Sequence, residues 1–394
     1  MDKKSTTWKN PWNIVCCVSL FLFIWGCGIC LFADATYGVG RVLKSLMIAG
    51  GILLLMGGAF KLLGTKRCLE LALSEKVLLP LLVLTLGMII AIHFMPSVEE
   101  INGAKRWIEI AGIRFQPSEP AKLLLIALGA KYLGPLLDGD VQQRIKYSQA
   151  WIPLVAGGAI CGAVYFQPDM GTMALLAGLV VGIYFMSGMK YKTVSACVLA
   201  FVALMIVAAM RESYRMERFR AWFDPWAYRH DEGYQAVQSL ITIGSGGFFG
   251  YWGQGVSKFG VPEAHTDYAF AVLCNEMGFF GFSILVILFY MLGRAISSIA
   301  FQAKSGRNFI LCAGISLLIV GQAVANMAMV SGIFPVIGVP LPLISYGGTS
   351  LLTTLLSLGL VYAVHRGNLR GEVAQAPKRR EELHVVSRRW RQHE

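Results

Sequence analysis

Residues 12–33 read WNIVCCVSLFLFIWGCGICLFA and include no Asp, Glu, Lys or Arg. A helix needs about 20 apolar residues to cross the hydrocarbon core of a bilayer, so this run predicts a membrane-spanning helix. The run is too long for the apolar part of a cleavable signal peptide, and no small-residue cleavage site follows it. We therefore expect it to remain in the protein as an anchor, preceded by an N-terminus of residues 1–11.

Runs of the same kind recur along the chain as far as residue 365. Together they predict ten spans, at 12–33, 44–63, 77–95, 117–137, 150–167, 169–188, 192–210, 268–292, 308–334 and 343–365. Composition agrees, because 56% of the 394 residues are hydrophobic and 15% are charged, against roughly 25% charged in soluble proteins. A cytosolic enzyme, a secreted disulfide scaffold, a disordered chain and an outer-membrane β-barrel are excluded. The predicted fold is an all-α polytopic integral membrane protein with a membrane domain of residues 12–365.

The net charge of +12 is distributed unevenly between the two sides of this predicted domain. With the N-terminus inside, the inner segments hold 22 Lys and Arg residues and the outer segments hold 11. Because cytoplasmic loops carry the excess of positive charge, both termini are predicted to be cytoplasmic. The basic residues of the tail, 366–394, favour a solvated topogenic role over binding to anionic lipid or an acidic partner. No nucleic-acid-binding module is present, so no nucleic-acid partner is expected.

One connection, residues 211–267 between the seventh and eighth spans, is much longer than the others. It is predicted to lie on the extracytoplasmic side of the membrane. Loops this long without a fold of their own are usually functional. Its Trp222, Trp226 and Tyr228 suit a membrane interface, because their rings are partly apolar and partly polar. Glycines then recur from Gly244 to Gly260, but they miss the dinucleotide-binding spacing and follow no predicted strand. We expect flexible or closely packed backbone near a ligand there.

Ionisable residues within apolar helices are costly and are therefore functional candidates. Glu119 and Lys122 stand three residues apart at the start of the fourth span, where they either neutralise each other or bind a ligand. Asp169 begins the sixth span on the same predicted side as Arg106 and Arg114. This arrangement places an acidic group beside basic ones at the outer surface.

A second polar group, Pro262-Glu263-Ala264-His265-Thr266-Asp267, ends the long loop. If a helix starts at Pro262, Glu263 and Asp267 share one of its faces. A metal triad of these two carboxylates with His265 is disfavoured, because His265 points elsewhere on such a helix. An outer carboxylate near arginines suggests a general base opposite groups that bind a phosphate-bearing substrate. A capping or packing role for Asp267 is equally consistent with the spacing.

The turn before the last span is rich in proline and glycine, from Pro340 to Gly348. It predicts a broken or re-entrant backbone, which is tolerated at membrane depth only where protein or water covers it. Such a segment would either line a substrate cavity or form a rigid turn.

These segments together resemble the SEDS family (shape, elongation, division and sporulation), whose members include FtsW and RodA. The resemblance covers nearly the whole chain and is carried by five groups of residues in the family's order. They are Lys105-Arg106-Trp107 with Phe115 to Glu119 and Lys122; Gln167 to Thr172; Asp224-Pro225-Trp226 with Gly233-Tyr234-Gln235 and Gln238-Ser239; Pro262 to Asp267; and Pro340 to Gly348.

The resemblance implies a peptidoglycan glycosyltransferase in the bacterial cytoplasmic (inner) membrane that polymerises lipid II at the outer face. Asp267 matches the family's essential aspartate and would be the base in an inverting transfer with undecaprenyl pyrophosphate as leaving group. Arg106 and Arg114 would stabilise that pyrophosphate. The other positions expected to bind substrate are Lys105, Glu119, Lys122, Glu263, His265 and Ser345. A divalent cation, magnesium or manganese, is implied through ligands that the sequence leaves unknown, and no organic cofactor is expected.

The family likeness also implies partners: lipid II, the nascent glycan strand, a class B penicillin-binding protein and other membrane proteins of division or elongation. Pro262 to Asp267 and Asp224 to Trp226 look like FtsW, whereas Asn326, Met329 to Gly332 and Val336 to Pro342 look more like RodA. The balance slightly favours FtsW, although Phe259 stands where some FtsW proteins carry a second carboxylate. Two alternatives remain: a flippase for lipid II and a non-catalytic scaffold.

Overall fold

The structure is a computed structural model that describes residues 10–33, 37–95, 105–110, 113–138, 149–189, 220–253 and 261–369, together with residues 192, 195, 196, 199 and 217. Within these residues, seven helices are long and apolar enough to cross a membrane: α1 (Pro11–Ala33), α2 (Gly38–Leu62), α4 (Glu75–Phe94), α5 (Ser118–Leu137), α11 (Ala269–Phe301), α12 (Gly306–Val330) and α13 (Gly348–Leu369). Two shorter apolar helices are α6 (Ile152–Tyr165) and α7 (Met170–Met186). All nine coincide with predicted spans, which confirms the polytopic helical fold. The remaining prediction, 192–210, lies outside the continuously described ranges.

Some elements were not predicted. They are the short helix α3 (Thr65–Ala72), the helix α10 (Tyr234–Ser245) and a hairpin of β1 (Ile108–Ile110) with β2 (Ile113–Phe115). None of them is an apolar run of spanning length, so hydropathy alone does not reveal them. Three predicted boundaries were also wrong by five residues or more: α2 begins already at Gly38, α11 continues to Phe301, and α13 begins only at Gly348.

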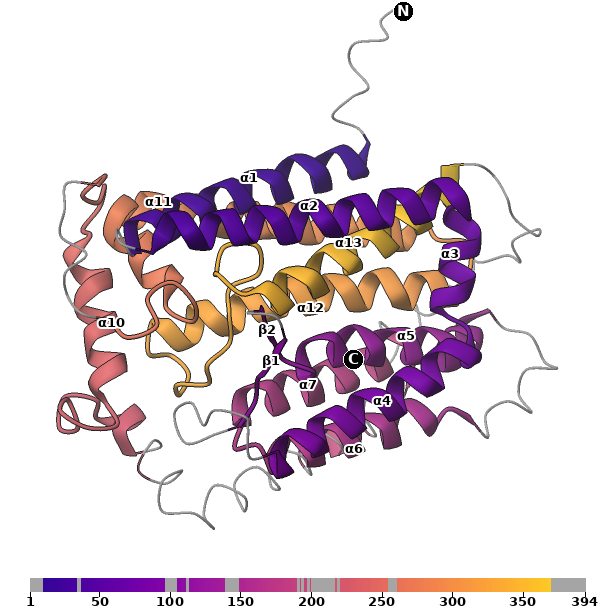
Figure 1. The fold of residues 1–394 in the computed structure, drawn as a ribbon, viewed down its shortest axis with the longest axis horizontal. Helices are drawn as coiled ribbons and strands as arrows, with labels where there is room; N and C mark the ends of the chain where they lie inside the picture. The colour runs from indigo at the N-terminus through magenta and orange to yellow at the C-terminus, as the bar shows by residue number, and fades with distance from the viewer. Residues whose placement is uncertain are drawn as a thin grey trace, which may run out of the picture.

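The long helices lie side by side, with α12 and α13 between α2 on one side and α4, α5 and α6 on the other (Figure 1). The helix α10 lies across one end of this bundle, and α3 lies at the opposite end (Figure 1). The hairpin and the irregular segment before α13 lie toward the α10 end. In α5 and α13, 67% of the most apolar window is buried by protein, so these two helices belong to the core.

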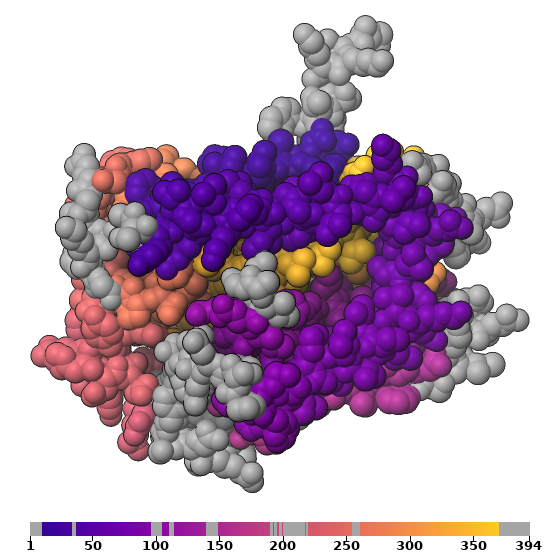
Figure 2. All heavy atoms as spheres, viewed as in Figure 1, coloured from indigo at the N-terminus to yellow at the C-terminus, as the bar shows by residue number. Residues whose placement is uncertain are grey.

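In contrast, α2 and α4 present apolar side chains to the surroundings. Only 11% of the apolar window of α2 and 22% of that of α4 are buried, and Leu54, Leu55 and Val83 are largely exposed. Figure 2 shows these two helices along one face, with α13 visible in the recessed band between them. A surface this apolar is stable only against lipid, which supports the membrane assignment.

Within α11 the helix breaks at Gly278, whose φ of 62° and ψ of −158° are not helical. The backbone amides of Phe279 and Phe280 instead donate to the carbonyls of Gly247 and Phe248, each at 3.0 Å. A Cβ at Gly250 would lie 2.2 Å from the carbonyl oxygen of Glu276, so glycine is required for this approach. Gly250 is thus closely packed against α11, as is Gly246, whose Cβ would lie 2.0 Å from the carbonyl oxygen of Cys274. Close packing was one of the two expectations for this loop, and it holds at these positions but not at Gly244 and Gly247, where a Cβ would meet no atom within 4 Å.

Candidate active site

Asp267 lies in a series of turns between Val261 and Tyr268, directly before α11. The prediction of a helix starting at Pro262 was wrong, because Glu263 has a φ of +54° and the helix begins at Ala269. Glu263 is exposed and accepts a hydrogen bond from the Thr266 hydroxyl at 3.0 Å. The two carboxylates therefore do not share a helical face, although they remain close enough to interact electrostatically.

The backbone at Asp267 is fixed by Asn326 of α12. The side-chain amide of Asn326 donates to the carbonyl oxygen of Asp267 at 2.7 Å and to that of Val339 at 2.6 Å. A Cβ at Gly338 would lie 3.3 Å from Oδ2 of Asp267. Asn326 is fully buried, so it joins three segments at the site from within the bundle. The sequence marked Asn326 only by its likeness to RodA and not as part of a site.

The surroundings of Asp267 disfavour its charged form. Burial chiefly raises the pKa of Asp267 to about 7, with further increases from the carboxylates of Glu263, Asp169 and Glu119 and a decrease from the guanidinium of Arg106. The side chain nevertheless keeps a partly exposed surface. A carboxyl group that titrates near neutral pH and remains accessible is suited to exchange a proton with a substrate.

Arg106 and Asp169 adjoin this site, as the sequence predicted. The Arg106 guanidinium donates to the carbonyls of Gln167 at 3.3 Å and Pro168 at 2.5 Å, and lies 3.9 Å from Oδ1 of Asp169. Asp169 caps α7 by accepting from the backbone amide of Thr172 at 3.1 Å, a common role for aspartate at a helix start. The cap and the backbone bonds hold Arg106 and Asp169 in place on one side of Asp267.

A buried network links α5 to α12 and to the segment before α13. The ammonium of Lys122 donates to Glu119 at 2.6 Å and to the side-chain oxygen of Gln322 at 2.9 Å. Gln322 in turn donates to the carbonyl of Pro340 at 2.9 Å. Lys122 is 1% exposed and Glu119 is 4% exposed, so the predicted mutual neutralisation is confirmed. A ligand role for either residue remains a prediction.

His265 and Ser345 lie at the junction of the loop with the segment before α13. The amide of Tyr346 donates to the carbonyl of His265 at 2.9 Å, and the two rings are 6.0 Å apart. Ser345 uses its hydroxyl oxygen to accept from the amide of Leu341 at 2.8 Å, which closes a turn. On the other side, Arg41 of α2 lies 6.0 Å from the centre of the Tyr346 ring. Sequence reasoning missed Arg41, although a charge entering an apolar run was the available signal.

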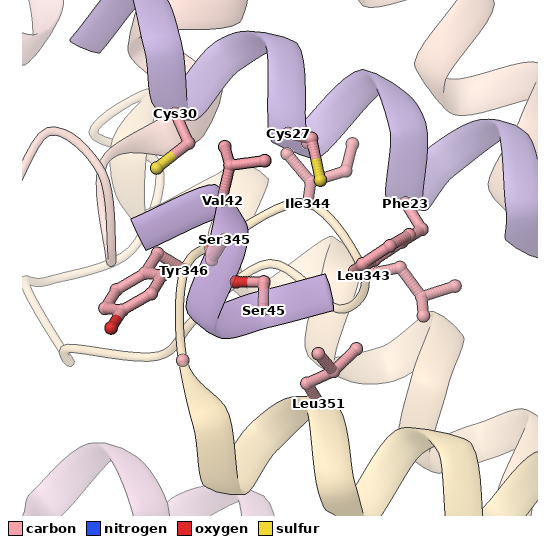
Figure 3. A pocket seen from close by; sticks show the side chains of 12 residues that line it. Phe23, Cys27, Cys30, Val42, Ser45, Leu343, Ile344, Ser345, Tyr346 and Leu351 are labelled. Atoms are coloured by element: carbon pink, nitrogen blue, oxygen red, sulfur yellow. The ribbon is translucent and has the colours of Figure 1, made fainter. Parts of the chain in front are cut away.

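Beside Ser345 is a small hollow of about 20 Å³ between α1, α2 and the segment before α13 (Figure 3). Figure 3 labels its side chains as Phe23, Cys27 and Cys30 of α1, Val42 and Ser45 of α2, Leu343 to Tyr346, and Leu351. This volume holds a water molecule but not a sugar. The segment before α13 is therefore closely packed against α1 and α2, so on this side it behaves as a rigid turn.

The other candidates are more peripheral. Lys105 donates to the carbonyl of Met95 at 3.4 Å. Arg114 is exposed and lies opposite Glu109 in the register of the hairpin. Its backbone carbonyl accepts a hydrogen bond from the Thr349 hydroxyl at 3.2 Å. Among the described residues, no three His, Cys, Asp or Glu side chains are placed to hold a metal ion. The metal triad with His265 is thus not formed.

The start of α7 meets the segment before α13 with no room for a side chain, since a Cβ at Gly171 would lie 1.8 Å from the carbonyl oxygen of Ile337. We expect Gly171→Ala to displace this backbone and to lower the free energy of unfolding by about 3 kcal/mol, the upper part of the range for overpacking. The measurement is thermal denaturation in detergent. Gly178→Ala in the same helix is the control, because its Cβ would meet no atom within 4 Å. Equal melting temperatures for the two variants would contradict the close packing.

Comparison with known proteins agrees with this arrangement. The family model of cell cycle proteins named after FtsW, RodA and SpoVE matches residues 14–369. A relative from Thiomicrospira cyclica named "Probable peptidoglycan glycosyltransferase FtsW" is 35% identical over 284 residues, covering 71% of this chain and 72% of its own. A relative of the same name from Halomonas elongata is 36% identical over 307 residues, covering 75% of this chain and 77% of its own.

Two solved structures have the same fold. One belongs to work on a peptidoglycan synthase complex that coordinates polymerization and crosslinking; it has a TM-score of 0.70 and 27% identity, and covers 90% of this chain and 96% of its own. The other is the rod shape determining protein RodA of Thermus thermophilus, with a TM-score of 0.62, 26% identity and coverage of 91% and 97%. With the family model matched from residue 14 to residue 369, the chain belongs to the FtsW/RodA/SpoVE family of cell cycle proteins.

Proposed function

We infer that this chain is a peptidoglycan glycosyltransferase that polymerises lipid II into glycan strands. One observation carries the inference: a partly exposed carboxyl group with a pKa near 7, Asp267, lies within the electrostatic range of a fixed arginine, Arg106. Such a pair suits a reaction that removes a proton and releases a phosphate group. The names of the relatives support the same activity, and their common name, FtsW, supports a role in cell division.

In the proposed reaction, Asp267 accepts the proton of the GlcNAc 4-hydroxyl of the acceptor. The hydroxyl oxygen forms a bond to the anomeric carbon of the MurNAc of the donor, and the bond from that carbon to pyrophosphate breaks with inversion. The lipid pyrophosphate leaves with the bonding electrons. Fixed positive charge stabilises it, and Arg106 is positioned for this role, with Arg114 nearby on the hairpin. Lys105, Glu263, His265 and Ser345 would contact the sugars or the phosphates.

We propose that a divalent cation would bind together with the substrate. The described residues gather no set of three ligands, so this part of the chain does not by itself form a complete metal site. The pyrophosphate of the substrate would have to supply further ligands.

We place the Asp267 end outside and both termini in the cytoplasm. Five basic residues lie at the opposite end of the bundle: Lys61 at the end of α2, Lys66 and Arg67 in α3, Lys304 between α11 and α12, and Arg307 at the start of α12. The positive-inside rule makes that end cytoplasmic. The partner would be a class B penicillin-binding protein, and the likeness to a complex that coordinates polymerization and crosslinking supports it.

The activity should depend on pH through Asp267. A general base must be deprotonated, so with a pKa of about 7 the value of kcat/KM for lipid II should fall about tenfold per pH unit below the midpoint. It should level off above about pH 8. Rates measured from pH 5.5 to 8.5, with lipid II binding followed separately over the same range, check this. A flat profile with unchanged binding would contradict a base at this position.

The function itself is tested by incubating the purified protein, alone and with its penicillin-binding partner, with lipid II and resolving products on a gel. A ladder of glycan strands is expected. If no ladder forms even with the partner and a divalent cation present, the result favours the flippase and scaffold alternatives over the glycosyltransferase. They are separated from each other by a lipid II translocation assay in vesicles.

A further inference from the structure

A cavity of about 240 Å³ lies at the end of the bundle opposite Asp267. It is bordered by the start of α4, the last turns of α5 and the turn between α11 and α12. Asp138, which borders it, lies 19 residues beyond Glu119, or about 28 Å along a helix axis. The cavity is therefore separate from the candidate active site, and it lies at the depth of lipid headgroups.

Among the described residues that border this cavity, the charges are balanced. Lys131 and Arg307 provide two positive charges, and Glu75 and Asp138 provide two negative ones. Lys131 lies 3.5 Å from Glu75, which is longer than the 2.7–2.9 Å typical of a direct charge-assisted hydrogen bond. Both side chains are partly open, at 25% and 48% exposure. This pair is loosely held, so each partner can contact a further group.

The remaining two charges leave further capacity for binding. Asp138 uses Oδ1 to accept from the backbone amide of Gly306 at 2.7 Å, and its second oxygen makes no hydrogen bond within the described part of the chain. Arg307 is exposed and forms no ion pair with any described residue. The cavity therefore offers a guanidinium and a carboxylate oxygen that the surrounding described residues do not satisfy.

A buried phenol also borders the cavity. Tyr132 as a residue is only 8% exposed, and its hydroxyl, which is not among the fully buried polar atoms without a partner, makes no hydrogen bond to the described residues. Among the bordering residues it is the one that packing fixes most firmly. An acceptor inside the cavity would satisfy it.

We propose that this cavity binds the headgroup of a zwitterionic phospholipid that carries a primary ammonium, that is, a phosphoethanolamine group. Its phosphate contacts Arg307, Lys131 and the Tyr132 hydroxyl, and its ammonium contacts Glu75 and Asp138. Basic pockets between membrane helices bind anionic lipid headgroups, and by the same electrostatics a pocket with both charges suits a zwitterionic headgroup. The balance of charge selects this headgroup: the two carboxylates disfavour a purely anionic lipid, and a quaternary ammonium cannot donate hydrogen bonds to them.

The test is retention of lipid by the full-length protein, measured by native mass spectrometry after exchange into detergent. Phosphatidylethanolamine, phosphatidylglycerol and phosphatidylcholine with identical acyl chains are offered in turn. At least fivefold greater retention of phosphatidylethanolamine is expected. Equal retention of the three lipids overturns the proposal, as does displacement by millimolar inorganic phosphate alone, since that outcome assigns the cavity to free phosphate.

Two pairs of variants locate the effect. Glu75→Gln removes one negative charge, so the preference should shift at least threefold from phosphatidylethanolamine toward phosphatidylglycerol, whereas Glu70→Gln on the exposed surface of α3 should change nothing. Arg307→Gln should abolish the preference, and Lys304→Gln in the same turn should keep it. The arginine and its control are both exposed, so their folding is not at risk. If either variant behaves like its control, the site assignment is wrong.

Discussion

An Asp267→Asn variant is expected to form no glycan ladder from lipid II under conditions in which the wild-type protein does. Asparagine keeps the size of the side chain but cannot accept the proton, and loss of a general base lowers a rate by about two to four orders of magnitude. The fold should be preserved, because Asn326 binds the backbone carbonyl at this position and not the carboxylate. The measurement is product length and initial rate on gels.

Asp231→Asn is the matched control for this experiment. Asp231 is an exposed carboxylate of the same long loop, so it should leave the ladder unchanged. If the Asp267 variant forms a ladder at the wild-type rate, the protein is still a glycosyltransferase but Asp267 is not its general base. Melting temperatures of both variants should match the wild type, which separates lost chemistry from lost folding.

The second large effect is expected at Lys122. Lys122→Met leaves the Glu119 carboxylate buried without its 2.6 Å partner, and breaking a buried pair in this way costs about 3–5 kcal/mol. The double variant with Glu119→Gln removes the stranded charge, so it should recover most of the stability. Denaturation in detergent measures both. Lys131→Met in the same helix breaks a partly exposed pair and should cost less than about 1 kcal/mol.

The double variant also decides between the two roles left open for Glu119 and Lys122. If stability and polymerisation return together, the pair serves only to hold α5, Gln322 and Pro340 in place. If stability returns and polymerisation does not, Lys122 or Glu119 contacts the substrate. Equal stability of the single and double variants would contradict the buried pair.

Most of the bundle could be predicted from hydropathy, because each span must satisfy its own backbone within lipid. The run at 12–33 corresponds to α1 within one residue at its start. The same reasoning fails where the chain leaves the hydrocarbon: α3 and α10 lie at the two ends of the bundle (Figure 1), so their sequences need not be continuously apolar. It also placed the start of α13 too early, since the apolar residues Leu343 and Ile344 lie in a turn and irregular backbone continues to residue 347.

The site was predictable only in part. Asp169 beside Arg106, and Glu119 beside Lys122, followed from short spacing or from a shared side of the membrane. Asn326 and Arg41 come from helices that are distant in sequence, and their roles depend on packing between α12, α2 and the loops. A single sequence contains no measure of such contacts, so these residues emerge only from the three-dimensional structure.

The break at Gly278 has a mechanical consequence. Residues 269–277 form a short helical segment that non-helical backbone separates from the rest of α11. Residues 247–252 bridge the break, because their amides at 251 and 252 donate to carbonyls before it and their carbonyls at 247 and 248 accept from amides after it. Asp267 lies just before this segment, where Asn326 holds its backbone carbonyl. The loop after α10 therefore splints the break in α11, and a displacement of this loop is coupled to the short helical segment that follows Asp267.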